Sequence, residues 1–290
     1  MNRGVILALS AYIFWGLHPI YWKQLQHVPS VEIVSHRIIW SFVFFLIIMT
    51  IRRDWKTWLG KMAESRNRWI LFLPAFLIGS NWAMYVWAVN AGYIIETSLG
   101  YFICPLITVF LGVLFCHEHL RKLQWAAVAI AGSGVLIMTI LYGQFPWISL
   151  YLAGTWGAYG LLRKKSPLSP VEGLMLETSV LTVIGLTVLM VSQCRGAGPL
   201  FPDLKTGLLL CGTGVISGLP LLVFIAGARL TPLSLIGILQ YVYPTLIFLT
   251  GVLVYHESLT RSKWTGFMFI WLALAIYTLE GVFRDRKTIN

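Results

Sequence analysis

Two charged side chains lie inside apolar stretches of this sequence, where they could bind or relay charge. Arg37 precedes the run IIWSFVFFLII, and Glu177 precedes TSVLTVIGLTVLMV. An ionisable group inside a membrane costs about 3 kcal/mol, so such groups normally face a cavity or a partner. The planar guanidinium of Arg37 suits a carboxylate, and a carboxyl group such as that of Glu177 can take up and release a proton. We therefore expect both to contact a solute, with Glu177 also serving as the proton-coupling site.

Both residues have structural alternatives. The Arg37 side chain could extend toward the outer membrane surface, or the two residues could form an internal salt bridge instead of contacting a solute. His36, next to Arg37, is a further candidate for the solute site. It could instead pack in the interior or pair with Glu32, which lies one helical turn earlier.

Polar and aromatic side chains recur inside other apolar stretches. Asn81 and Tyr85, for example, share one helical face at positions i and i+4. Such residues often join helices or fill the interior. Together they predict a cavity near the middle of the membrane with aromatic walls and few polar groups, suited to a small amphipathic or zwitterionic solute. The predicted lining residues are Trp15, Asn81, Trp82, Tyr85, Tyr101, Gln240 and Tyr241.

The elements that must position these residues are membrane-spanning helices. The 290 residues are 58% hydrophobic and 11% charged, whereas a soluble domain carries about 25% charged residues. Apolar runs of roughly 17–25 residues cross a membrane as helices. The sequence predicts an all-α integral membrane protein with ten transmembrane helices, at about 4–22, 31–51, 69–89, 95–116, 124–141, 147–162, 172–192, 206–226, 233–254 and 264–283.

The chain also repeats itself. Residues 105–125 and 244–264 align without a gap and share eight of 21 positions, including a proline, Pro105 or Pro244, and a His-Glu pair. We predict two five-helix repeats, residues 1–145 and 146–290. Because five is odd, the second repeat must enter the membrane from the opposite side, an arrangement found in many secondary transporters. Pro105 and Pro244 fall at matched positions and are predicted to kink their helices.

The net charge of +11 reports orientation in the membrane. If the N-terminus lies inside, sixteen of the 22 lysines and arginines fall on inner connections and five on outer ones. This bias places both termini in the cytoplasm. Basic residues beside anionic lipid account for the charge, so we expect the lipid bilayer as a partner and no nucleic acid.

The sequence suggests no resident metal or cofactor. Its four cysteines show no CxxC spacing, and three of them fall within predicted spans, so we also expect no disulfide. We interpret the His-Glu pairs at 117–118 and 256–257 as structural groups at the rim of the bundle. We expect the protein to act as a monomer.

Several segments resemble the RarD family of the drug/metabolite transporter superfamily, whose repeat unit is called EamA. The resemblance covers nearly the whole chain and implies ten helices, cytoplasmic termini, a central cavity between the repeats and an inner-membrane permease of bacteria. It does not imply which solute is carried. The matching segments are AYIFWGLHPIYWK (11–23), HRIIWSF (36–42), IGSNWAMYVWAVN (78–90), SLGYFICPL (98–106), YGLLRKK (159–165), LMLET (174–178), LPLLVFIAGA (219–228) and LQYVYPTLIFL (239–249).

The function predicted from these features is that of a secondary transporter, not an enzyme. It would move a small amphipathic metabolite or drug by alternating access, as proton-coupled export. An alternative is a membrane-embedded enzyme that acts on a lipid-linked substrate, because such enzymes place histidine and carboxylate groups at the membrane rim. A channel would need a continuous polar lining, which none of the predicted spans offers.

Overall fold

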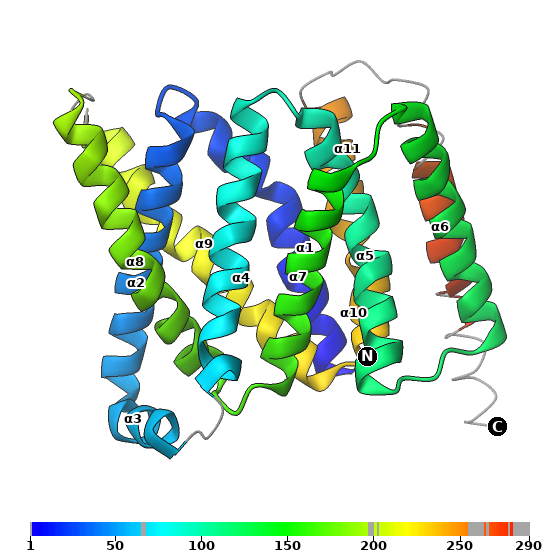
Figure 1. Cartoon of the computed structure of the whole chain (residues 1–290), viewed down its shortest axis with the longest axis horizontal. Helices are drawn as coiled ribbons and strands as arrows, with labels where there is room; N and C mark the ends of the chain where they lie inside the picture. The colour runs from blue at the N-terminus through cyan, green and yellow to red at the C-terminus, as the bar shows by residue number, and fades with distance from the viewer. Residues whose placement is uncertain are drawn as a thin grey trace.

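The computed structural model describes residues 2–64, 68–196, 200–201, 203–254, 264, 267–277 and 279–280, and all regular structure in these residues is helical. This confirms the predicted all-α class. The elements, shown in Figure 1, are α1 (Arg3–Trp22), η1 (Lys23–Leu25), α2 (Ser30–Arg52), α3 (Trp55–Glu64), α4 (Arg68–Asn90), α5 (Ile94–Cys116), α6 (Lys122–Tyr142), α7 (Trp147–Lys165), α8 (Pro170–Cys194), α9 (Leu204–Leu230), α10 (Leu233–Leu239) and α11 (Val242–Leu253).

Eight helical segments in the described residues are long and apolar enough to cross a membrane. They correspond to eight of the ten predicted spans. The predicted span 147–162 forms α7, but this helix ends in Arg163, Lys164 and Lys165 and is less apolar than the others. The predicted span 264–283 is described as an apolar helix over Phe267–Tyr277.

The helix α3 was not expected, because residues 52–68 were interpreted as a connection. It lies across the lower end of the bundle in Figure 1, the end at which α1 begins. Trp58 donates its ring N–H to the Glu172 carbonyl at 3.0 Å, and Lys61 forms an ion pair of 2.9 Å with the Glu172 carboxylate. The short helix is therefore attached to the first turn of α8.

The long helices form two groups. In one group α7 packs against both α4 and α5; in the other α2 packs against α8 and α9, and α1 against α9 and α11. The helix α10 lies on α5, where Gly237 permits close approach, since a Cβ atom there would lie 2.6 Å from the Pro105 carbonyl oxygen. Figure 1 shows α4 and α5 beside α7, with α1 and α9 crossing behind them.

The two predicted kinks differ in the structure. The helix α5 runs through Pro105 without a break. The corresponding span of the second half is divided: α10 ends at Leu239 and α11 begins at Val242, two residues before Pro244. Proline cannot donate the backbone hydrogen bond that would continue the preceding turn, which accounts for a break at this place.

A carboxylate of the first half caps a helix of the second half. The helix α5 ends at Cys116, and the following His117 has left-handed backbone angles. Glu118 then accepts hydrogen bonds from the backbone N–H groups of Leu233 at 2.6 Å and Ser234 at 2.7 Å. These groups begin α10 and have no partner within the helix. The contacts agree with the structural interpretation of Glu118, whereas Glu257 lies outside the described residues.

Replacing Glu118 by alanine should destabilise the protein without altering its cavity. The variant loses two hydrogen bonds to a charged acceptor, for a cost of about 2 kcal/mol, which corresponds to a fall of about 5 °C in unfolding temperature. The measurement is thermal unfolding of the purified protein in detergent, with the exposed neighbour His119→Ala as control. An equal unfolding temperature for Glu118→Ala and wild type would contradict the capping role.

Candidate functional site

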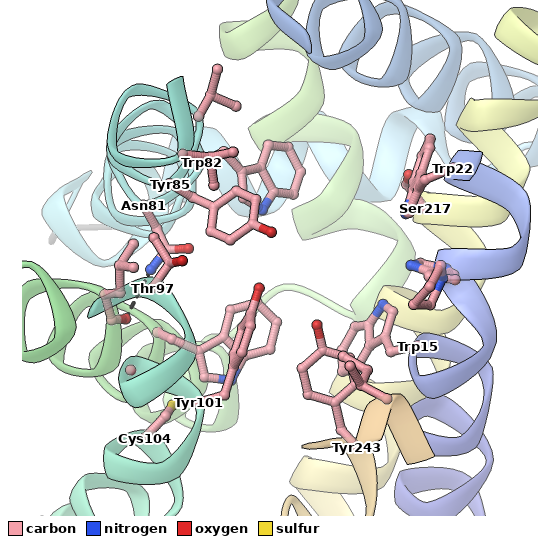
Figure 2. A pocket seen from close by; sticks show the side chains of 18 of the residues that line it. Trp15, Trp22, Asn81, Trp82, Tyr85, Thr97, Tyr101, Cys104, Ser217 and Tyr243 are labelled. Atoms are coloured by element: carbon pink, nitrogen blue, oxygen red, sulfur yellow. Dashed lines mark hydrogen bonds between the residues drawn. The ribbon is translucent and has the colours of Figure 1, made fainter. Parts of the chain in front are cut away.

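A cavity of about 610 Å³ lies between the two helix groups, above the contacts at the lower end of the bundle. One wall comes from α4, α5 and α7, and the other from α1, α2, α9 and α11. Figure 2 shows Asn81, Trp82, Tyr85 and Tyr101 facing Trp15, Trp22, Ser217 and Tyr243 across the open space. The volume is in the range of sites that hold one small organic molecule.

Arg37 is the cationic centre of this cavity. Its guanidinium lies over the Trp82 ring at 4.1 Å from the ring centroid, a favourable cation–π contact. Its Nε atom is buried and has no hydrogen-bond partner. In the described part of the chain no carboxylate approaches the guanidinium to ion-pair distance, and none of the described lining residues is acidic.

Eight aromatic side chains are among the other described residues that line the cavity. The Trp15 ring meets the Trp156 ring edge to face at 5.4 Å, and both rings contact Phe224 below them. The Tyr101 ring lies 5.2 Å from the Tyr243 ring, in a T-shaped pair. These contacts hold the rings in fixed orientations, so the cavity has rigid aromatic walls.

Two predicted solute-binding residues line the cavity but already have partners within the protein. The Asn81 amide donates to the Leu152 carbonyl and to the Thr155 hydroxyl, both at 2.8 Å, and so joins α4 to α7. The Gln240 amide donates to Cys104 Sγ at 3.1 Å. These contacts correspond to the structural alternative, in which polar groups join helices.

Seven of the ten predicted solute-binding residues line the cavity and three do not. His36 is one residue and about 100° of helix away from Arg37, and its ring packs against Phe201 at 5.5 Å. The Tyr241 hydroxyl is buried and donates to the Phe102 carbonyl at 3.2 Å. The seven that line it are Trp15, Arg37, Asn81, Trp82, Tyr85, Tyr101 and Gln240.

The third exception is Glu177, which was expected to face the cavity. It lies toward the lower end of the bundle, where its Oε1 atom is 3.2 Å from Arg163 Nε and its Oε2 atom accepts a 2.9 Å hydrogen bond from the Tyr159 hydroxyl. The expectation was wrong because Arg163, which follows the predicted span 147–162 and was one of the sixteen residues assigned to inner connections, is a buried residue of α7. Glu177 therefore has a counter-charge, and it is not Arg37.

The ion pair between Arg163 and Glu177 joins the two helix groups. Both side chains are 2% exposed, and the closest atoms meet at ion-pair distance without the alignment of a hydrogen bond. The guanidinium also donates to the Pro170 carbonyl at 3.2 Å. Gly173 makes room for it, since a Cβ atom at that position would lie 1.9 Å from the guanidinium.

Lys164 adds a second connection between the groups at this end. Its ammonium donates to the Ala228 carbonyl at 3.1 Å and to the Thr231 carbonyl, at the end of α9. The bundle is therefore closed at its lower end by charged contacts between α7 and the helices α8 and α9, while the cavity separates the groups above.

The sequence did not single out several further residues of the cavity. His18 lies one turn after Trp15, and its Nε2 atom is 3.0 Å from the Ile216 carbonyl. Ser217 is 4% exposed and its hydroxyl has no hydrogen-bond partner. One signal was available, since the Trp-Gly pair at 15–16 recurs at 156–157 in the second half. The residues missed include Tyr12, His18, Trp22, Trp156, Ser217 and Tyr243.

The ion pair predicts an asymmetry between single and double variants. Removing one member of a buried pair leaves an uncompensated charge and costs about 3–5 kcal/mol, whereas removing both costs much less. Arg163→Met should therefore lower the unfolding temperature strongly, and Arg163→Met combined with Glu177→Gln should recover part of the loss. The control is Lys165→Met, which removes an exposed cation from the same helix. A double variant less stable than Arg163→Met would contradict the pairing.

The sequence profile of the EamA-like transporter family matches residues 2–140 and 146–279. Among similar proteins, the uncharacterized transporter YojE of Bacillus subtilis is 45% identical over 285 residues, covering 97% of this chain and 95% of the relative. Protein RarD of Escherichia coli is 39% identical over 288 residues, covering 99% and 97%.

A solved crystal structure shares the fold, with a TM-score of 0.72 at 16% identity, and the match covers 96% of this chain and 98% of the other. The sequence matches extend over almost the full length of the bacterial relatives, and the eight apolar helices agree with a multi-pass membrane protein. The chain belongs to the EamA-like transporter family and is a homologue of its RarD proteins.

Proposed function

We propose that this protein is a monomeric secondary transporter of the bacterial inner membrane. It binds a small amphipathic metabolite or drug in the cavity and exports it by alternating access in exchange for protons. The observation that carries the proposal is the shape of the bundle, in which a cavity with one cation opens at the upper end while buried charged contacts close the lower end.

Two inverted repeats, residues 1–145 and 146–290, account for this shape, with ten transmembrane helices in all. The EamA profile matches the chain twice, on either side of the proposed boundary. The His-Glu segment also recurs in register at an offset of 139 residues. Two similar halves of opposite orientation can exchange conformations, which opens the central site first to one side and then to the other.

The proposed orientation places both termini in the cytoplasm. Even without the buried Arg163, the basic residues of the connections favour the side on which α1 begins. The cavity opens at the other end of the bundle, so the conformation described here faces outward. Inward opening then requires α7 to separate from α8 and α9, which breaks the contacts of Arg163 and Lys164.

Glu177 is the proposed proton-coupling group, although it does not line the cavity. It is 2% exposed and carries the only carboxylate paired with Arg163 in the described part of the chain. Protonation would remove its negative charge and with it the Coulomb attraction between α7 and α8. Proton uptake would in this way favour opening of the lower end.

Transport can be tested in proteoliposomes loaded with a bacterial metabolite extract. Wild-type vesicles under a pH gradient should lose particular solutes, detected unchanged in mass in the outer medium. Vesicles that contain Arg37→Ala should release at least ten-fold less of these solutes, because this variant removes the counter-charge for the anionic group of the solute. Glu177→Gln should retain solute release but not its dependence on the pH gradient. The matched control is Lys205→Ala, an exposed cation outside the cavity.

Solutes that change in mass would favour the membrane-embedded enzyme acting on a lipid-linked substrate. Equal release by Arg37→Ala and wild type would show that the arginine serves only as an anchor, and an unchanged pH dependence in Glu177→Gln would remove its coupling role.

The orientation predicts which single cysteines react from outside. In a background with the four native cysteines replaced by serine, Lys205→Cys should react with a membrane-impermeant thiol reagent added to intact cells, and Lys56→Cys should react only after the membrane is permeabilised. The two positions lie at opposite ends of the bundle, at the start of α9 and within α3. Labelling of Lys56→Cys in intact cells would contradict the proposed topology.

A further inference from the structure

We infer that the cavity selects aromatic carboxylic acids that carry no positive charge, in preference to zwitterionic amino acids and to amines. This inference rests on the proposed transport function and names the class of solute. It narrows the amphipathic or zwitterionic solutes expected from the sequence to aromatic monoanions. Three observations lead to it: the charge of the lining, the surroundings of Arg37 and the aromatic walls.

The first observation is the charge of the lining. Arg37 is a cation within the lining, and no aspartate or glutamate is found among the described residues that line the cavity. Glu177, the carboxylate that the sequence placed here, is paired with Arg163 instead. A carboxylate on the ligand would neutralise Arg37, whereas an ammonium group would be desolvated with no counter-charge, which is unfavourable.

The second observation is the set of hydrogen-bond donors near Arg37. The Trp82 ring covers one face of the guanidinium, and its buried Nε atom has no hydrogen-bond partner among the described residues. In Figure 2 the hydroxyls of Tyr85, Tyr101 and Tyr243 are directed into the same space. Phenol hydroxyls and guanidinium N–H groups can all donate to one carboxylate.

The third observation concerns the remainder of the ligand. The rings of Trp15 and Trp156 contact each other at 5.4 Å and are backed by Phe224. Rigid rings stack favourably on an aromatic ligand, and a ring loses less conformational freedom on binding than a flexible alkyl chain does. The amides of Asn81 and Gln240, which could have bound polar parts of an amino acid, already have partners.

The inference can be tested with four ligands of similar size, each with a six-membered carbon ring on a short chain. Binding of 3-phenylpropionate, phenylalanine, phenethylamine and 3-cyclohexylpropionate to the purified full chain is measured by isothermal titration calorimetry. We expect 3-phenylpropionate to bind at least ten-fold more tightly than phenylalanine, a comparison that isolates the effect of the added ammonium group. We expect the same margin over phenethylamine, which carries an ammonium group in place of the carboxylate. We expect 3-phenylpropionate to bind several-fold more tightly than 3-cyclohexylpropionate, which isolates the effect of the aromatic ring.

Two variants test the part of Arg37. Arg37→Gln should weaken 3-phenylpropionate binding at least ten-fold and abolish the preference over phenethylamine, whereas Lys205→Ala should bind as wild type does. Arg37→Lys keeps the positive charge but lacks the planar guanidinium. Its affinity for 3-phenylpropionate should lie between those of Arg37→Gln and wild type. Because the four-ligand comparison uses the wild-type protein, the test does not depend on the variants folding.

The inference is overturned if phenylalanine or phenethylamine binds as tightly as 3-phenylpropionate, or if none of the four ligands binds. Flux of the same ligands in proteoliposomes separates this inference from the proposed function. Arg37-dependent flux of phenylalanine would support a transporter with a different solute class. Selective binding of 3-phenylpropionate without flux would support the solute class and contradict transport.

Discussion

The buried ion pair between Arg163 and Glu177 is the contact on which the proposed alternating-access cycle depends. Both groups are 2% exposed, so neither can lose its partner without leaving a charge in an apolar interior, at a cost of about 3–5 kcal/mol. The pair joins α7, which packs with α4 and α5, to α8, which packs with α2. In the proposed cycle, this pair holds the two helix groups together at the lower end while the upper end is open.

The charge in the cavity, in contrast, is unpaired in the described part of the chain. Its cation, Arg37, has no acidic partner among the described lining residues. Arg37 is stabilised by the face of Trp82, but this contact leaves its positive charge without a counter-charge. A ligand with a carboxylate therefore gains the interaction that the protein does not supply. Glu177 has its counter-charge within the protein, whereas Arg37 has none among the described lining residues and is the proposed solute-binding group. In the proposed cycle, the solute neutralises Arg37 in one step and a proton neutralises Glu177 in another.

The sequence predicted where the membrane-spanning helices lie. It was less informative about which neighbouring helix or cavity each side chain contacts. Apolar runs predicted the helices because their length is set by membrane thickness, and Arg37 was recognised because an arginine inside such a run is costly unless it faces a cavity or a partner. Glu177 was assigned to the cavity because depth along a helix does not tell which neighbour a side chain meets. Arg163 was missed because it begins a basic run, RKK at 163–165, that also reports membrane orientation. The break before Pro244 and the intact helix at Pro105 show that matched prolines need not have matched effects.

The most direct test of this account is a distance across the lower end of the bundle. Spin labels at Arg68, which begins α4, and Leu230, which ends α9, report whether the two helix groups stay together there. Electron–electron double resonance of the wild-type protein in lipid nanodiscs should give one short distance. With Glu177→Gln, a longer distance should appear, because the attraction to Arg163 is lost. An identical distance distribution in both proteins would show that the ion pair does not hold this end closed.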